Sequence, residues 1–386
     1  MMRPDYDGGS IVNLMRSVAD ACGAAALPYA PLRGPALPAA AGRSIVLLVL
    51  DGLGFNHLQR AAAGGELHRR LRSPLTSVFP STTAAAVTTF LTGLAPQQHA
   101  LTGWHMYFRE LDAVTAVLPL RPRGGGRFDA APGELPQRLF GHAPLVSRLA
   151  RRSVFVAPQS IAASEFSRYH AGDAQVRSYT DLSDCFAQIE AALGAAAAPL
   201  YVYAYYPELD ALAHAHGIAS PEVADHLAAI DAAFGRFMAA IRGTRALVLA
   251  TADHGFIDSP PARTVDLAQH PRLAALLAQP LCGERRVAYC YLRPGRAQDF
   301  DAYVAQHLAD CATAHDSIKL VGDGWFGPGA PDPRLAQRVG DRVLEMHDDW
   351  TLLDWLPMEK RYPQIGVHGG TSADEMRVPL VVAEAG

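Results

Sequence analysis

Three short fragments of the sequence carry side chains at spacings that suit metal binding. Asp210 and His214 are four residues apart, which places a carboxylate and an imidazole on one face of a helical turn. Asp253 and His254 are adjacent and are followed by a glycine. His368 lies in the run GVHGG, whose glycines free the backbone to present the imidazole in a close-packed site. Singly, each fragment is more often structural, so a metal site requires that the three meet in space.

The apolar runs that precede these fragments predict such a meeting. A third aspartate, Asp51, closes the run SIVLLVL, and Asp253 follows the run ALVLA. Asp210 follows the run LYVYAYY after a short turn. Short, continuous apolar runs are typical of buried parallel strands, and open α/β sheets place their ligands at the carboxyl edge of the strands. We therefore expect the three carboxylates at one edge of a central sheet.

The combined ligand set is large enough for two ions. It contains three aspartates and three histidines: Asp51, Asp210, Asp253, His214, His254 and His368. With one added hydroxyl, these donors suit two divalent cations. Mixed imidazole and carboxylate donors favour Zn²⁺ over Mg²⁺, which prefers oxygen ligands and water. We predict two Zn²⁺ ions, with other divalent metals such as Mn²⁺ as alternatives.

The hydroxyl is expected from residues 77–103. Within this stretch, Ser81, Thr82 and Thr83 are N-cap candidates for a helix over residues 84–91. The N-terminus of a helix exposes free N–H groups and the positive end of the helix dipole, which favour a bound phosphate. A hydroxyl at this place can either cap the helix or take part in phosphate chemistry.

The composition is that of an ordinary globular chain and excludes several classes of protein. Of the 386 residues, 49% are apolar and 19% are charged, and the formal net charge is −4. The chain has no basic footprint for a nucleic-acid polymer, and no apolar stretch approaches the ~18 residues of a membrane span. The N-terminus lacks the features of a signal peptide, and five cysteines without CxxC spacing favour a reducing compartment. We expect a cytoplasmic protein that acts on small molecules, and the oligomeric state stays open.

The order of the expected elements predicts an α/β fold. Helical periodicity is found over residues 10–27, 181–193 and 221–241, and further strands are expected over residues 113–120 and 153–157. Together with the three apolar runs that precede the aspartates, these elements alternate between strand and helix. Such alternation is typical of a doubly wound core.

The pattern changes after Gly255 and predicts an insertion. Helices are expected over residues 265–277 and 297–312, with a strand over residues 286–292 between them. We predict a catalytic core over residues 1–259, an inserted α+β cap subdomain over residues 260–345, and a return to the core over residues 346–386.

Five motifs, in this order, resemble those of the nucleotide pyrophosphatase/phosphodiesterase family of the alkaline phosphatase superfamily. They are VLDGLG, FPSTT leading into LTGLAPQQHA, PELDALAHAHG, TADHG and VHGGTSADEMRVPLVV. The resemblance covers residues 44–255 and 366–382. It implies an alkaline-phosphatase-like three-layer α/β/α sandwich with a mostly parallel central sheet and a small inserted α+β subdomain.

The resemblance also implies roles for the site residues. It places the nucleophile on Thr83, with Thr82 as the close rival. One zinc ion would be bound by Asp51, Asp253, His254 and the Thr83 oxygen, and the other by Asp210, His214 and His368. Metal coordination would activate the threonine, a weak nucleophile at neutral pH, and water would hydrolyse the resulting covalent phospho-threonine-type intermediate.

The sequence departs from the family pattern at one position. The diesterases of the family usually carry an asparagine after a glycine downstream of the nucleophile, where it donates to the transferred phosphoryl group. Here Gly103 is followed by Trp104. The candidates for a replacement donor, and so for substrate binding, are the backbone N–H groups at the helix start, the Trp104 indole, His105 and Tyr206.

We therefore predict a two-zinc phosphodiesterase or nucleotide pyrophosphatase that acts on a small phosphoester, nucleotide-derived compounds included. The missing asparagine keeps open a phosphomonoesterase or a phosphonate hydrolase on the same core. A second alternative is a non-catalytic protein that binds phosphate ligands. A dinucleotide-dependent enzyme is disfavoured, because the GLG run after the first strand lacks a third glycine and the histidines would have no role.

Overall fold

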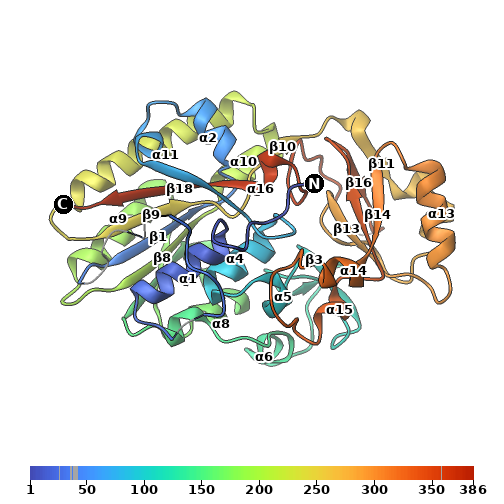
Figure 1. Ribbon diagram of the computed structural model, residues 1–386, viewed down its shortest axis with the longest axis horizontal. Coiled ribbons are helices and arrows are strands. Elements are labelled where there is room, and N and C mark those ends of the chain that lie inside the picture. Colours follow the sequence, from blue (N-terminus) through green and yellow to red (C-terminus); the bar gives the residue numbers. More distant parts are fainter. Residues whose placement is uncertain (26, 35–36, 38–41, 358) are drawn as a thin grey trace.

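The computed structural model describes residues 1–25, 27–34, 37, 42–357 and 359–386. The larger part of the molecule is built on a central sheet with helices on both faces, and a second sheet lies beside it (Figure 1). The predicted three-layer α/β/α sandwich is confirmed. None of the helices in the described ranges is long and apolar enough to cross a membrane.

The central sheet has seven strands, in the order β2-β18-β9-β1-β8-β6-β7. Five of them form a parallel block: β9 (Leu247–Thr251), β1 (Ile45–Leu50), β8 (Tyr201–Tyr206), β6 (Ser153–Pro158) and β7 (Gln175–Tyr179). The remaining strand pairs, of β18 (Arg377–Glu384) with β9 and of β18 with β2 (Leu71–Thr76), are antiparallel. The sheet is therefore mostly parallel, as predicted.

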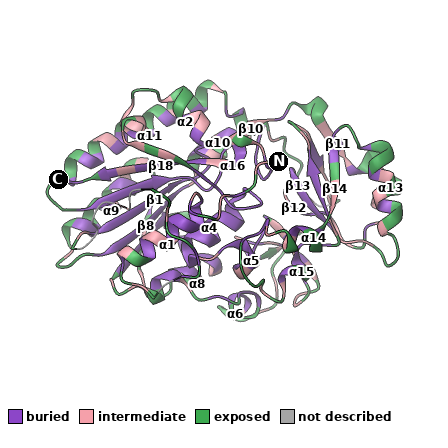
Figure 2. Ribbon diagram, viewed as in Figure 1, coloured by how far each residue is buried: buried purple, intermediate pink, exposed green. Residues whose placement is uncertain are grey.

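Helices cover both faces of this sheet. One face carries α1 (Ile11–Ala21), α4 (Thr83–Thr92) and α8 (Glu165–Ala171), and the other carries α2 (Phe55–Ala61), α9 (Leu182–Gly194), α10 (Glu208–His216) and α11 (Pro221–Ala240). Every residue of β1, β8 and β9 is buried as a result, and the strands appear uniformly buried in Figure 2. Burial on both faces explains why these strands are continuous apolar runs in the sequence.

The second sheet combines strands from two distant parts of the chain. Its order is β14-β15-β13-β12-β3-β4-β5. Three strands precede β6 in the sequence: β3 (His105–Phe108), β4 (Ala113–Ala116) and β5 (Arg121–Pro122). Four follow β9: β12 (Cys282–Gly283), β13 (Val287–Cys290), β14 (Ala312–Asp316) and β15 (Arg342–Met346). Helix α13 (Ala297–His307) lies at the outer edge of this part (Figure 1).

Two short strand pairs form separate two-stranded sheets. They are β10 (Ile257–Asp258) with β17 (Gly366–Val367), and β11 (Thr264–Asp266) with β16 (Thr351–Leu353). The chain therefore leaves the core after β9 and returns to it through β17 and β18.

The predicted helix over residues 265–277 is wrong. The structure has strand β11, then a 3₁₀ turn over Leu267–Gln269 and the single turn α12 (Pro271–Ala274). Pro271 lacks an N–H, and the residue before a proline is disfavoured in the helical region, so a helix cannot continue through this point. The Asp266 carboxylate also accepts the N–H of Ala268 at 3.0 Å, which starts a new turn there.

Candidate metal centre and active site

The ends of three neighbouring strands bring the aspartates to one place. Asp51 extends β1 by one residue, and its N–H donates to the carbonyl oxygen of Tyr206 at 2.9 Å. Asp253 follows β9, and Asp210 lies in the first turn of α10, which begins after β8. Because β9, β1 and β8 are adjacent and parallel, their carboxyl ends share one edge of the sheet.

The histidines reach the same edge by different routes. His254 is adjacent to Asp253, and His214 lies one helical turn after Asp210 in α10. His368 follows β17, whose partner β10 begins soon after His254. The rings of His254 and His368 stack with their centroids 3.7 Å apart.

The nitrogen and oxygen atoms of these side chains are close enough to share ions. His254 Nε2 lies 3.3 Å from Asp51 Oδ1, 3.5 Å from Asp253 Oδ2 and 4.0 Å from Asp210 Oδ1. Asp210 Oδ1 lies 3.5 Å from His214 Nε2 and 3.8 Å from His368 Nε2. In the described ranges, two ligand groups share His254: Asp51, Asp253 and His254, and Asp210, His254 and His368.

Each histidine is oriented by a backbone carbonyl group. The Nδ1 atoms of His214, His254 and His368 lie 2.8, 3.1 and 3.3 Å from the carbonyl oxygens of Gly366, Gly255 and Ser81, respectively. A carbonyl oxygen can only accept, so Nδ1 donates and the lone pair is on Nε2. All three Nε2 lone pairs are therefore available to the cluster, the arrangement found for metal-binding histidines.

The aspartates each leave an oxygen without a hydrogen bond. Asp51 Oδ2 accepts from the Tyr205 hydroxyl, and Asp253 Oδ1 accepts from the N–H groups of Gly52 and His254 at 3.1 and 3.0 Å. Among the residues described, Asp51 Oδ1, Asp210 Oδ1 and Asp253 Oδ2 are buried and have no hydrogen-bond partner. Buried carboxylate oxygens without partners are costly, and divalent cations would remove that cost. The donor set thus fits a metal centre.

The pKa shifts agree with this interpretation. Burial, then the charges of Asp253 and Asp210, raise the pKa of Asp51 well above its usual value. Burial and the charges of Asp253 and Glu284 do the same to the pKa of Asp210. Burial lowers the pKa of His214 to about 4. A neutral imidazole beside mutually repelling carboxylates is the state that binds a cation.

Thr83 lies at this cluster and Thr82 does not. Thr83 is the first residue of α4, and its Oγ1 lies 3.1 Å from His254 Nε2. Thr82 is the N-cap residue, but its side chain makes no capping hydrogen bond and donates instead to the Glu284 carboxylate. The two rival hydroxyls therefore have different partners, and only that of Thr83 contacts a metal-ligand candidate.

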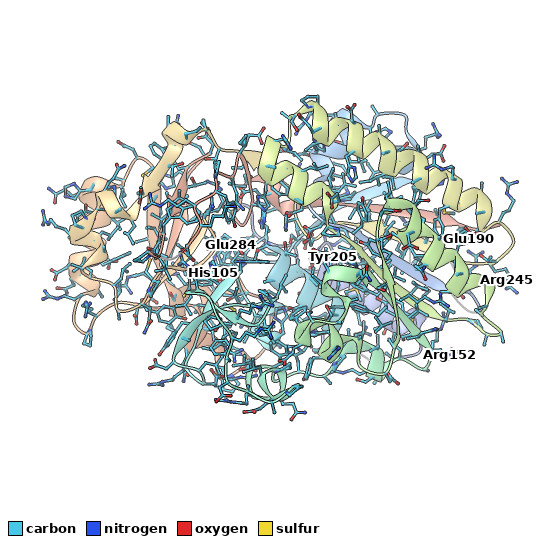
Figure 3. The ribbon with its side chains drawn as sticks, turned by 180° about the vertical axis from the view of Figure 1, so that it is seen from behind. His105, Arg152, Glu190, Tyr205, Arg245 and Glu284 are labelled. Carbon is cyan, nitrogen blue, oxygen red and sulfur yellow. The ribbon has the colours of Figure 1, made fainter. Side chains whose placement is uncertain are left out.

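A cavity of about 470 Å³ opens beside the two threonines. Asp210, His214 and His368 line one part of it, and residues of the second sheet and of the segment before β17 line the rest. Trp104 and His105 are lining residues. Tyr206 is not among them, and its hydroxyl lies 3.1 Å from His226 Nε2. Figure 3 shows His105 and Glu284 at the junction of the two parts, and Tyr205 on the core side.

Comparison with known proteins identifies the family. The family described as Type I phosphodiesterase / nucleotide pyrophosphatase matches residues 45–371. The chain belongs to this family. Its members are metal-dependent, and membership makes the chain a phosphoester hydrolase with candidate metal ligands in place. No curated protein sequence matches the chain.

Solved structures show the same fold as this phosphodiesterase-family chain. Murine ectonucleotide pyrophosphatase/phosphodiesterase 5, an inactive threonine-to-alanine variant in complex with AMP, is 17% identical with a TM-score of 0.66, and the match covers 88% of this chain and 87% of that chain. Phosphonoacetate hydrolase from Sinorhizobium meliloti, in complex with phosphonoformate, is 16% identical with a TM-score of 0.66 and coverages of 88% and 90%.

Glu284 is a site residue of this family member that sequence reasoning missed. Its Oε1 accepts the hydroxyl of Thr82 and, at 2.7 Å, the N–H of Trp104, the residue where a family asparagine is expected. Gly103 lies against Gly283, and a Cβ on Gly103 would come within 2.7 Å of the Gly283 Cα. This close backbone contact brings Glu284 beside Thr82 and Trp104, and no sequence motif marks it.

Proposed function

We propose that the chain hydrolyses small phosphodiesters or nucleotide pyrophosphates, with Thr83 as nucleophile and two Zn²⁺ ions as cofactors. The observation that supports this most strongly is the Thr83 hydroxyl, 3.1 Å from His254 Nε2, beside three buried carboxylate oxygens without partners. A hydroxyl next to such a cluster can be activated by a metal ion, and no other hydroxyl of the N-cap run has that position.

The ligands divide between two ions. Asp51, Asp253, His254 and the Thr83 oxygen would bind one ion, and Asp210, His214 and His368 would bind the other. When bound, such ions lower the pKa of a coordinated hydroxyl or water and stabilise developing negative charge. The Nδ1 contacts to backbone carbonyls keep the three imidazoles in the tautomer that binding needs.

The reaction then follows from the position of Thr83. Its oxygen loses a proton and attacks phosphorus in line with the leaving group, which departs with the electron pair of the broken ester bond. Water hydrolyses the phospho-threonine bond and regenerates the hydroxyl. Because the Thr82 side chain does not cap α4, the first N–H groups of this helix would be free to stabilise the charge that develops.

The relatives support a small phosphorus-containing substrate. The murine protein was solved with AMP as an inactive threonine-to-alanine variant, and the Sinorhizobium meliloti protein was solved with phosphonoformate and with phosphonoacetate. Two observations keep a phosphonate hydrolase as a second candidate function. They are the structural similarity to phosphonoacetate hydrolase and the presence of Trp104 in this chain where the family asparagine is expected.

A substrate comparison with the zinc-loaded protein tests the proposal. Bis-p-nitrophenyl phosphate, p-nitrophenyl phosphate and phosphonoacetate represent the diester, monoester and phosphonate classes. We expect the diester to have the highest kcat/KM and all turnover to disappear with a chelator. A preference for phosphonoacetate would establish the second candidate, and no turnover of any of the three with two zinc ions bound would contradict the proposal.

A further inference from the structure

Arg285 lines the cavity beside Thr83 and, within the described ranges, makes no ion pair. We propose that Arg285 binds a second anionic group of the substrate, a carboxylate or a phosphate. The substrate class is then a phosphoester or phosphonate with two separated anionic groups, one at the metal ligands and one at Arg285. This inference rests on the proposed function for the chemistry of the first group.

Aromatic rings hold the guanidinium group in place. Its central carbon lies 5.3 Å from the ring centroid of Trp355 and 5.7 Å from that of Tyr362. Within the described ranges, the guanidinium nitrogens of Arg285 make no ion pair and no hydrogen bond to a protein group. Contact with ring faces attracts and orients a guanidinium group but leaves its N–H donors unused.

The carboxylates around the cavity are bound elsewhere. Asp354 and Glu359 pair with Arg123, at 3.5 and 2.8 Å. The Oε1 atom of Glu284 accepts from Thr82 and Trp104. The charge of Glu284 acts on Arg285, but none of these three carboxylates makes an ion pair with it.

The next residue shows what a structural arginine looks like here. Arg286 is 2% exposed, pairs with Glu375 at 3.1 Å and donates to the carbonyl oxygens of His347, Asp348 and Trp350. Arg285 has the same chemistry on the cavity side and has none of these partners. The contacts of Arg286 are those of a structural residue, whereas, in the described part of the chain, the N–H donors of Arg285 stay free for a ligand.

The size and chemistry of the cavity favour a ligand with two anionic groups. A volume of about 470 Å³ is in the range of pockets for small organic molecules, so one phosphate group at the metal ligands leaves room for a substituent. The guanidinium fork matches the two oxygens of a carboxylate or a phosphate.

Calorimetric binding to the zinc-loaded protein tests this role without turnover. The probes are propylphosphonate, 3-phosphonopropionate and ethane-1,2-bisphosphonate, together with homologues one methylene longer. They share an alkylphosphonate and differ in whether a methyl, a carboxylate or a second phosphonate is at the far end. We expect at least one doubly anionic probe to bind about tenfold tighter than its alkyl counterpart, and the better of the two identifies the second group.

Variants assign the difference to Arg285. In Arg285→Gln the advantage of the second anion should fall to less than about twofold, with the affinity for propylphosphonate unchanged. The matched control is Arg272→Gln, since Arg272 lies over the Tyr303 ring at 5.9 Å in the same part of the molecule and does not line the cavity. This control should retain the full advantage.

The outcomes separate this inference from the proposed function. If the wild-type protein shows no advantage for any doubly anionic probe, or if Arg285→Gln retains it, the role of Arg285 is wrong even when diesters are hydrolysed. If the advantage depends on Arg285 but no phosphoester is hydrolysed, Arg285 stands as an anion-binding residue and the proposed function fails.

Discussion

Two buried clusters of charged residues lie close together in this protein and differ in how they are completed. In the first, Arg286 and Glu375 are almost fully buried and use their polar atoms on each other and on neighbouring groups. Glu375 also accepts the Gly370 N–H at 2.8 Å and the Ser372 hydroxyl at 2.7 Å. In the second, three aspartate oxygens have no partner in the part of the chain that the structure describes.

The first cluster is a structural network whose polar atoms have partners, and the second contains carboxylate oxygens that have none among the described residues. Within the described ranges, the only ion-pair partners of Asp51, Asp210 and Asp253 are histidines, and burial lowers the pKa of these histidines. A buried network is stable only when its members are satisfied. The first cluster meets this condition with protein groups alone, and the second needs cations from outside.

The largest expected effect concerns Thr83, the proposed nucleophile beside the aspartate cluster. Thr83→Ala should lower kcat of the diesterase reaction by about four orders of magnitude, because the attacking oxygen is removed. Both metal ions should stay bound, since six ligands remain. Steady-state kinetics and elemental analysis check the two statements.

Thr82→Ala is the matched control for the nucleophile. Its hydroxyl donates to Glu284 and has no contact with the metal-ligand candidates in the structure, so we expect a loss of less than about tenfold. A larger loss in Thr82→Ala than in Thr83→Ala would move the nucleophile to Thr82.

Breaking each cluster should have opposite effects on the metal-free protein. Arg286→Met leaves Glu375 charged and unpaired, and it should lower the free energy of unfolding by about 3–5 kcal/mol. Asp51→Asn removes one of three mutually repelling carboxylates, and it should be neutral or stabilise the metal-free protein by about 1 kcal/mol. Urea unfolding in the presence of a chelator measures both. Equal destabilisation by the two variants would remove the distinction between the clusters.

A single histidine substitution should reduce metal binding. His368→Ala removes an Nε2 donor that lies 3.8 Å from Asp210 Oδ1, and the zinc content should fall below two ions per chain. His216→Ala is the control, because His216 lies near Glu222, at 3.9 Å, and not in either ligand group. Elemental analysis showing the same zinc content in both variants would refute the assignment of His368.

The smallest effect is a pH dependence that belongs to Glu284. Burial raises the pKa of its carboxyl group to about 7, although its bonds to Thr82 and Trp104 oppose the shift. Since the folded pKa is above the unfolded one, stability should be lost as pH rises from about 4.5 to about 7 and then level off. Glu284→Gln removes the titrating carboxyl group, so the variant should lose about 1 kcal/mol less stability over this range than the wild-type protein. The difference is small because the Glu284 side chain is partly exposed.

Unfolding of the metal-free protein at pH 5 and pH 8 checks this prediction. The wild-type protein should lose more stability between the two values than Glu284→Gln. The comparison cancels the titration of Asp51, which both proteins share. The substitution also removes a charge that raises the pKa of Asp210, so the measured difference includes that smaller effect. A constant difference between the two proteins across this range would contradict the raised pKa.

The core of the fold could be predicted because burial on both faces leaves a clear sequence signal. The strands β1, β8 and β9 are found where the runs SIVLLVL, LYVYAYY and ALVLA indicate them. Adjacent parallel strands share an edge, so the places of Asp51 and Asp253 followed from the strand ends. The Asp210–His214 spacing likewise gave a common helical face, and these two residues lie 3.5 Å apart.

The second sheet could not be predicted because its strands are short and pair over long distances. β12 has two residues, and it joins β3, more than 170 positions earlier, to β13. No local pattern indicates such a pairing, so the sequence did not connect Glu284 and Arg285 with Thr82 and Thr83. Tyr206 was a donor candidate by its place in the sequence, but its hydroxyl contacts His226.

Anomalous diffraction from zinc-soaked crystals tests most directly whether the cluster of Asp51, Asp210 and Asp253 binds two divalent cations. We predict two peaks at the zinc edge, about 3.5–4 Å apart, one beside Asp51, Asp253 and Thr83 and the other beside Asp210, His214 and His368. Absence of a peak at these side chains, with zinc bound elsewhere or not at all, would contradict this prediction.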